Sequence, residues 1–520
     1  MKQKKLALLL LSPAFLMMIT GCDFNKAPVT PDNPPIDDDE PNNPIHIDED
    51  CVIAPSQEYM QFWNPSTTLS INVTMTQAAA DFLNDYQCDH NDSRYHDYYV
   101  PCTFLLTMGG VEYNFEEVGV RIKGNMSRRN ILQSDNFSLE SLGHYKFSFK
   151  ETFDDEEYTE IEPLRQFAKT WEDSAAKKAR KKRTLFDMEK IDIKWNRNDD
   201  QTKSKQAYAL DVFRISGVLA GHDTLAKTTL GIAGKDPITT TYEVLECIDS
   251  VFIKRHFGET YADGDLYKCT YTDKGPANMS GTITIGNQIG VEDNTNYFHP
   301  SYDLKTNKKK NTTHENFFNF VSVVKNKSLS AAEWKKAIEK VLDVETFIKY
   351  ESIAFLLGNF DDMRNNANNY YLYFTSGEKP KAFVIPYDFD RCLGAGAEGR
   401  KEYMTNYSAE STKMQCSGDW QTNNLFWRIC CTSTDSASGH STIERVEDYR
   451  LQYQLNIQDL LNNGVISNET FVNYVNSFPE EYRGNPNGAG NGNTTFANYL
   501  SLKINNIKND VYTSGYDIRV

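Results

Sequence analysis

Two short polar segments carry the residues whose types are best suited to chemistry. The first, 359–369, contains Asp361 and several asparagines, and the second, 386–390, contains Asp388 and Asp390. Phosphoryl transfer uses such groups, because one aspartate handles the proton of the nucleophile while aspartate and asparagine oxygens hold Mg²⁺. Either segment alone is also typical of turns capped by side chains, so only the two together favour this chemistry.

The spacing inside these segments matches motifs of nucleotide-dependent enzymes. Asp361 and Asn366 stand five residues apart, like the aspartate and asparagine of the protein-kinase catalytic loop. Asp388 is followed by Phe389, as in the metal-binding Asp-Phe-Gly motif of those enzymes. Both fragments agree with transfer of a phosphoryl group from ATP with the help of Mg²⁺.

The elements expected around the two segments would place them at the edge of a core. A helix is predicted over 343–357, because the chain stays apolar up to the Gly358 that ends it. The apolar segments 370–373 and 381–385 predict a short hairpin between the two polar segments. The polar side chains should therefore lie together at one end of this hairpin.

Earlier in the chain, a second hairpin is predicted. Apolar residues alternate with polar ones over 118–122 and again over 145–150, which is the period of a half-buried strand. A basic turn, 124–129, follows the first of these strands, and a helical pattern runs over 201–219. The prediction is an α+β fold.

Composition excludes several classes of function. The chain has 520 residues, with 55 Lys and Arg against 72 Asp and Glu, so its net charge is −17. Nucleic acids and anionic membranes require a basic face, and we expect neither as a partner by charge. At 39% hydrophobic and 24% charged residues, the chain is typical of a globular protein.

The N-terminus is typical of a bacterial lipoprotein. Three lysines precede the apolar run 6–19, and the segment 19–22, Ile-Thr-Gly-Cys, resembles a lipobox whose Cys22 is lipidated. The following 23–50 holds six prolines and nine acidic residues, which predicts a disordered tether. The expected location is the bacterial cell envelope, on the periplasmic side of the outer membrane or the cell surface, with the lipid as the membrane contact.

Ten cysteines in an exported chain predict disulfides. Cys88 with Cys102 and Cys247 with Cys269 are the plausible local bridges, although sequence does not fix the pairing. The sequence contains neither a CxxC pair nor HExxH, so a zinc site has little support. A metal, if bound, would be held by oxygen.

Taken in order, several segments resemble the CotH kinase family, whose founding members are spore-coat proteins with an atypical protein-kinase fold. The similar segments are 118–127 (VGVRIKGNMS), 146–150 (KFSFK), 207–218, 242–249 (YEVLECID), 265–268 (DLYK), 358–373 and 385–390 (IPYDFD). The resemblance reaches from about residue 118 to about 453. It implies a two-lobed fold, with an N-lobe made mainly of β-sheet and a mixed helical C-lobe.

The resemblance also implies roles for individual residues. Asp361 would be the catalytic aspartate, with Asp362 as the alternative, and Asp388 would bind the metal with Asp390 near it. Asn366 and Asn369 compete as the second metal ligand. The nucleotide would be bound by the following residues: Gly124, Asn125, Ser127, Arg128, and Lys146 or its competitor Lys150.

Two departures from the family pattern weaken the expectation of activity. Met126 replaces a small polar residue of the loop, and Gln206 stands where a helix carboxylate would pair with Lys146. Glu246 is the remaining candidate for that pairing.

The expected organisation is a signal peptide at 1–22, the tether at 23–50, a segment of unknown role at 51–117, the kinase-like domain at 118–453 and a C-terminal extension with helices at 454–520. The favoured function is an ATP- and Mg²⁺-dependent kinase acting on Ser or Thr of an exported protein, itself included. The alternatives are a pseudokinase and a structural or glycan-binding surface lipoprotein.

Lipidation of Cys22 gives the first testable prediction. A diacylated cysteine supplies the two lipid chains that stable membrane anchoring needs. Cys22→Ser should therefore move the protein from the membrane fraction to the soluble fraction on immunoblots of fractionated cells. Membrane association that is unchanged in this variant would refute the lipid anchor.

Overall fold

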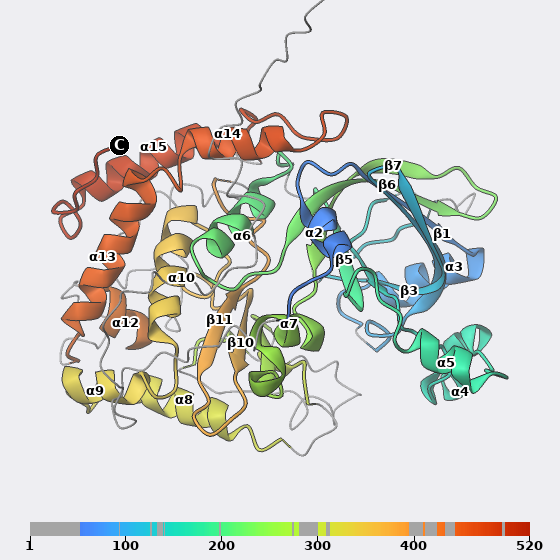
Figure 1. Cartoon of the computed structure of the whole chain (residues 1–520), viewed down its shortest axis with the longest axis horizontal. Helices are drawn as coiled ribbons and strands as arrows, with labels where there is room; N and C mark the ends of the chain where they lie inside the picture. The colour runs from blue at the N-terminus through green and yellow to red at the C-terminus, as the bar shows by residue number, and fades with distance from the viewer. Residues whose placement is uncertain are drawn as a thin grey trace, which may run out of the picture.

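The protein is described here from a computed structural model. It describes residues 53–92, 94–124, 127–132, 139, 141–196, 199–272, 275–279, 300–307, 312–394, 409–410, 424–431, 443–490 and 494–520. A β-barrel forms one side of the molecule, and a helix-rich part built around a second sheet forms the other (Figure 1). This arrangement confirms the predicted α+β class.

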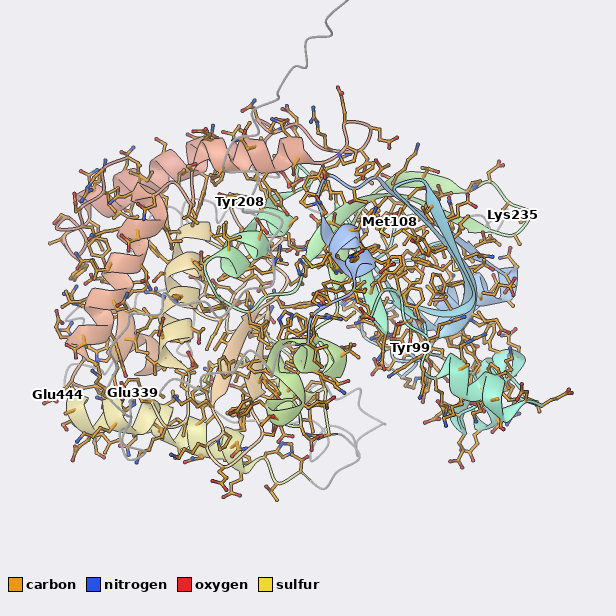
Figure 2. All side chains as sticks on the ribbon, in the orientation of Figure 1. Tyr99, Met108, Tyr208, Lys235, Glu339 and Glu444 are labelled. Atoms are coloured by element: carbon orange, nitrogen blue, oxygen red, sulfur yellow. The ribbon has the colours of Figure 1, made fainter. Side chains whose placement is uncertain are left out.

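The barrel contains seven strands and closes on itself. Its strand order is β1 (Leu69–Met75), β2 (Val100–Met108), β3 (Val111–Ile122), β4 (Tyr145–Ser148), β5 (Lys190–Trp195), β7 (Ile238–Glu246) and β6 (Asp223–Ile232). Neighbouring strands are antiparallel except β1 and β6, whose parallel pairing closes the barrel. Side chains alternate between the two faces of each strand, and apolar ones such as Phe104, Val120 and Phe147 belong to one buried core cluster. Figure 2 shows the side chains that crowd the barrel.

Short helices surround the barrel. Helices α2 (Gln57–Trp63) and α3 (Gln77–Gln87) flank β1 in the sequence. The connection from β4 to β5 contains α4 (Glu157–Glu160), the 3₁₀ helix η2 (Glu162–Phe167) and α5 (Ser174–Arg180). Helices α4 and α5 lie on the far side of the barrel from the helix-rich part (Figure 1).

The second sheet has four antiparallel strands in the order β11 (Ala382–Pro386), β10 (Tyr370–Phe374), β8 (Asp265–Cys269) and β9 (Tyr302–Leu304). The helix-rich part contains α6 (Lys205–Ile215), α7 (Ser250–Tyr261), α8 (Glu315–Lys325), α9 (Ala331–Ile338), α10 (Val344–Leu357), α12 (Asn424–Cys430), α13 (Glu447–Asn462), α14 (Asn468–Ser477) and α15 (Phe496–Asn509). Helix α13 packs against α10 and α12.

The predicted helix before the first polar segment is confirmed as α10. Asp343 caps its start by accepting a hydrogen bond from the backbone N–H of Thr346 at 3.0 Å. Gly358 ends it in the left-handed region (φ 61°), where its N–H donates to the carbonyl of Ala354. Strands β10 and β11 confirm the predicted hairpin.

The expected segment boundaries at residues 118 and 454 fall inside elements. Residue 118 lies within β3, and the preceding segment supplies β1 and β2 to the same barrel. Residue 454 lies within α13. The tail beyond it returns to the barrel, because the Tyr482 hydroxyl donates to the carbonyl of Thr67 and accepts from the N–H of Leu69, both at 3.1 Å.

The two predicted disulfides are absent. Seven described cysteines are free and buried, namely Cys88, Cys102, Cys247, Cys269, Cys392, Cys430 and Cys431. Cys88 donates instead to the carbonyl of Leu83 at 3.4 Å, while Cys247 contacts the ammonium of Lys146 at 3.2 Å. The remaining three cysteines, the signal peptide and the tether lie outside the described residues.

None of the described helices combines the length and the apolar character needed to cross a membrane.

Free thiols lead to a labelling prediction. Burial raises the pKa of Cys88 and of Cys247 to about 12, so these thiols should be protonated and unreactive in the native protein. A maleimide should label few of the seven in the native state and at least seven thiols per chain after denaturation without reductant. Mass spectrometry counts the labels. Fewer than seven labels per denatured chain would show that some of these cysteines form a disulfide.

Candidate active site

A row of charged residues on the outer face of the barrel forms one half of the site. Along β5, Ile191 and Ile193 point into the barrel, so Asp192 and Lys194 point outward by strand alternation. Lys146 on β4 is the register partner of Asp192, and it therefore shares the outer face.

Lys194 joins this face of the barrel to the second polar segment. Its Nζ donates to Asp388, to Asp390 at 3.1 Å and to the side-chain oxygen of Gln206 at 2.9 Å. The Lys194 side chain is 3% exposed, whereas Asp388 and Asp390 keep 33% and 25% exposure. Burial would lower the pKa of Lys194, but the two aspartates raise it well above its usual value.

Asp192 is shared by two other lysines. Its carboxylate lies 2.7 Å from the Nζ of Lys123 and 3.1 Å from that of Lys146. Burial alone would raise the pKa of Asp192, but these two ammonium groups lower it below its usual range. Lys123 also donates to the hydroxyl of Tyr387 at 3.1 Å, which places it beside the residue that precedes Asp388.

Asp361 is held by amide groups of its own loop. One carboxylate oxygen accepts from the amides of Asn366 at 2.6 Å and Asn368 at 3.0 Å, and the other accepts from Asn369 at 3.1 Å. Burial raises the pKa of Asp361 despite the opposing effect of the hydrogen bonds from Asn366 and Asn368. Asn366 and Asn369, the two proposed metal ligands, thus both contact the proposed catalytic residue.

Asn359 connects the two polar segments. Its side-chain oxygen accepts from the N–H of Asp361 at 3.0 Å, and its amide donates to the backbone carbonyl of Asp388 at 3.4 Å. Asn359 is fully buried, so this link is protected from water. The structure therefore brings Asp361 and Asp388 together as the sequence predicted.

Asp362 points into the core instead of toward Asp388. Its carboxylate accepts from the backbone N–H of Asn365 at 2.7 Å and is 1% exposed. Burial and the nearby Glu351 raise the pKa of Asp362 to about 8. The adjoining Arg364 pairs with Glu351 and donates to Tyr453, which anchors the loop on α10 and α13.

In the predicted phosphate loop, Gly124 and Arg128 are both constrained by their surroundings. Gly124 has φ +93°, and a Cβ at this position would lie 2.0 Å from the Oγ of Ser127, so only glycine fits. The guanidinium of Arg128 donates to three backbone carbonyls, those of Gly124, Gln87 and Ile122. Asn125 lies outside the described residues.

Two predicted partners of the nucleotide lie elsewhere. Lys150 pairs with Glu189, whereas Lys146 lies beside Asp192 and Cys247. Glu246 does not pair with Lys146, because it lies on the same face of the barrel sheet as its register partner Ile191, the face opposite to Asp192. Its carboxylate binds Arg255 and accepts from the hydroxyl of Tyr59 at 2.8 Å.

Gln206 connects Lys194 to a buried acidic pair. Its amide nitrogen donates to Asp223 at 2.7 Å and to Glu243 at 3.2 Å. Burial raises the pKa of Asp223 to about 7, and burial with the charge of Asp223 raises that of Glu243. A carboxylate in place of Gln206 would add a third acid here, so the amide is the group that this environment accepts.

Sequence reasoning missed Lys194 and Asp192. Both lie at the polar positions of the alternating segment 190–195, which on its own is typical of a strand with one face in water. Their spacing could have indicated them, because residues two apart on a strand lie on the same face and here carry opposite charges.

Asp388 and Asp390 are the two described carboxylates of the site that could contribute ligands to a divalent cation. Both carboxylates converge on one cation, the ammonium of Lys194, so their geometry already suits a positive charge. No group of three or more Cys, His, Asp or Glu residues in the described part of the chain could form a metal site. Mg²⁺ fits two carboxylates, because it commonly takes its other ligands from phosphates and water.

The site thus combines aspartates on two linked loops with lysines of a neighbouring sheet, which are residue types that phosphoryl-transfer enzymes use. Comparison with family models gives a match to the CotH kinase protein family over residues 120–484. This match covers more than half of the chain, which therefore belongs to the CotH kinase family. The matched region extends beyond residue 453 to include α14. A comparison with curated proteins found no match.

The position of Lys194 predicts opposite effects of its removal on stability and on metal binding. Lys194→Met should lower stability by roughly 1–3 kcal/mol, because two partly buried carboxylates lose their cation. Mg²⁺ should then bind Asp388 and Asp390 more tightly in the absence of nucleotide and restore part of the stability. Urea denaturation with and without millimolar Mg²⁺ measures both effects.

Lys150→Met is the matched control, since Lys150 pairs with the single carboxylate of Glu189 outside the site. Its stability should respond to Mg²⁺ as the wild type does. If Mg²⁺ stabilised Lys194→Met no more than it stabilises the control, the idea that Lys194 stands in for the metal would be wrong.

Proposed function

We propose that this chain is an ATP- and Mg²⁺-dependent protein kinase that phosphorylates Ser or Thr residues of an exported protein, itself included. Membership of the CotH kinase family supports a kinase-like function. The observation that carries the proposal is the link through Asn359 between Asp361 and Asp388. This link keeps a candidate base beside a candidate metal ligand, which phosphoryl transfer requires.

Asp361 would accept the proton of the attacking hydroxyl. Three amides fix its carboxylate, and burial raises its pKa, which moves its basicity toward neutral pH. One carboxylate lone pair must remain for the substrate, because the amides use only part of the accepting capacity of the two oxygens. Asp362, which is buried against Asn365, is less suited to this role.

Asp388 and Asp390 would hold Mg²⁺, with the side-chain oxygen of Asn366 or Asn369 as a further ligand. The bound cation would neutralise charge on the phosphate oxygens. Lys194 would then exchange its carboxylates for the phosphates. Lys146, together with the loop that contains Gly124, Asn125, Ser127 and Arg128, would bind the remaining phosphate oxygens.

A pseudokinase is the second candidate, and the ion pairs of Lys194 favour it. A lysine that binds both Asp388 and Asp390 competes directly with a metal. In either case we propose a lipoprotein of the bacterial cell envelope, anchored through Cys22 with the folded part outside the membrane. Nucleic acid is not a proposed partner.

Substitutions in the two loops separate metal binding from the chemical step. Asp388→Ala should abolish Mg²⁺-dependent ATP binding, because the metal loses its main ligand. Asp361→Ala should keep ATP binding within about twofold and reduce phosphate transfer by roughly 100- to 10,000-fold, the range for losing a general base. Lys146→Ala should raise the ATP concentration that is needed for half-maximal phosphate transfer. Calorimetry measures binding, and transfer of radiolabel from ATP to the protein or to a generic acceptor measures activity.

Asp459→Asn on the exposed face of α13 is the control, and it should match the wild type in both assays. Metal-dependent binding by the wild type without transfer to any acceptor would favour the pseudokinase. If the wild type bound no ATP with any divalent metal, the kinase proposal would fail.

A further inference from the structure

Lys268 lies beside the site but belongs to the second sheet. It is on β8, where its register partners are Tyr371 of β10 and Asp303 of β9. Its half-buried side chain ends at the aromatic ring of Tyr387, with Nζ 4.9 Å from the ring centroid. Tyr387 thus has two ammonium groups next to it, that of Lys123 at its hydroxyl and that of Lys268 against its ring.

Lys268 differs from the other lysines of the site in having no acidic partner. Lys123 and Lys146 share Asp192, and Lys194 binds Asp388 and Asp390. The site thus contains three aspartates and four lysines. Within the described residues, no carboxylate forms an ion pair with the fourth lysine, Lys268. Asp303, its register partner, pairs instead with Lys305.

The surroundings make the charge of Lys268 costly. Burial lowers the pKa of Lys268 to about 8, and the cations of Lys305 and Lys123 contribute further. The negative charge of Asp388 offsets only part of this effect. A half-buried ammonium among other cations is stabilised when an anion binds beside it.

We infer that Lys268 is a binding residue for the phosphate chain of the nucleotide. The inference rests on the proposed function, and it adds a residue from the second sheet to the phosphate-binding set. The charges of Lys268 and Asp388 act on each other, so an anion bound at Lys268 would lie near the proposed metal ligand. The charges of the other lysines are already partly neutralised by carboxylates, whereas Lys268 has no ion-pair partner among the described residues.

Charge variants of Lys268 in the folded chain test this inference. Lys268→Gln should weaken binding of Mg²⁺-ATP and of Mg²⁺-tripolyphosphate by roughly 10- to 100-fold, the effect expected for losing a bond between charged groups. Lys268→Arg should stay within about threefold of the wild type, because it keeps the charge. Adenosine binding should be unchanged. The exposed Lys227→Gln on β6 is the control for loss of one positive charge.

Tripolyphosphate separates this inference from the proposed function. Binding of tripolyphosphate that depends on Lys268 supports the inference even if ATP does not bind, in which case the kinase proposal alone fails. Three outcomes would overturn the inference: the wild type binds no tripolyphosphate, Lys268→Gln binds it as the wild type does, or the variant loses adenosine and tripolyphosphate equally.

Discussion

The buried ammonium of Lys194 is the contact on which the arrangement of the site depends. It comes from a barrel strand, and its three partners come from the segment after β11 and from α6, so one group connects three elements. Moving a lysine out of water is costly unless opposite charges and hydrogen bonds replace the solvent. Asp388, Asp390 and Gln206 provide this replacement, and together they fix where the barrel meets the helix-rich part.

The local chemistry of the sequence was sufficient to predict the loops with Asp361 and Asp388. An apolar helix that ends at Gly358 and a hairpin of two apolar segments are short-range features, and the structure contains both. Lys194 and Asp192 could not be found in this way. A polar residue on an alternating strand normally faces water, and only the packing of α6 and the second sheet against the barrel buries these charges.

Tertiary structure also explains the failed pairings. Glu246 and Lys146 are close in the fold, but alternation along neighbouring strands sends their side chains to opposite faces of the barrel wall. The cysteines are similar, because proximity in sequence suggested bridges for Cys88 and Cys247, whereas each thiol is buried as a small side chain with a local polar contact. Which face of the sheet a side chain lies on depends on the register of the strands, and the sequence alone does not give that register.

The balance of charge in the site follows from these contacts. In the described site every carboxylate on the outer face of the barrel or after β11 already has a cation or a buried amide as its partner. If the proposed function holds, a divalent cation at Asp388 and Asp390 would compete with Lys194, which would then need a new anion. A phosphate chain would provide this anion, so binding of the metal and binding of phosphate would each favour the other. On this proposal, one lysine would couple the two ligands.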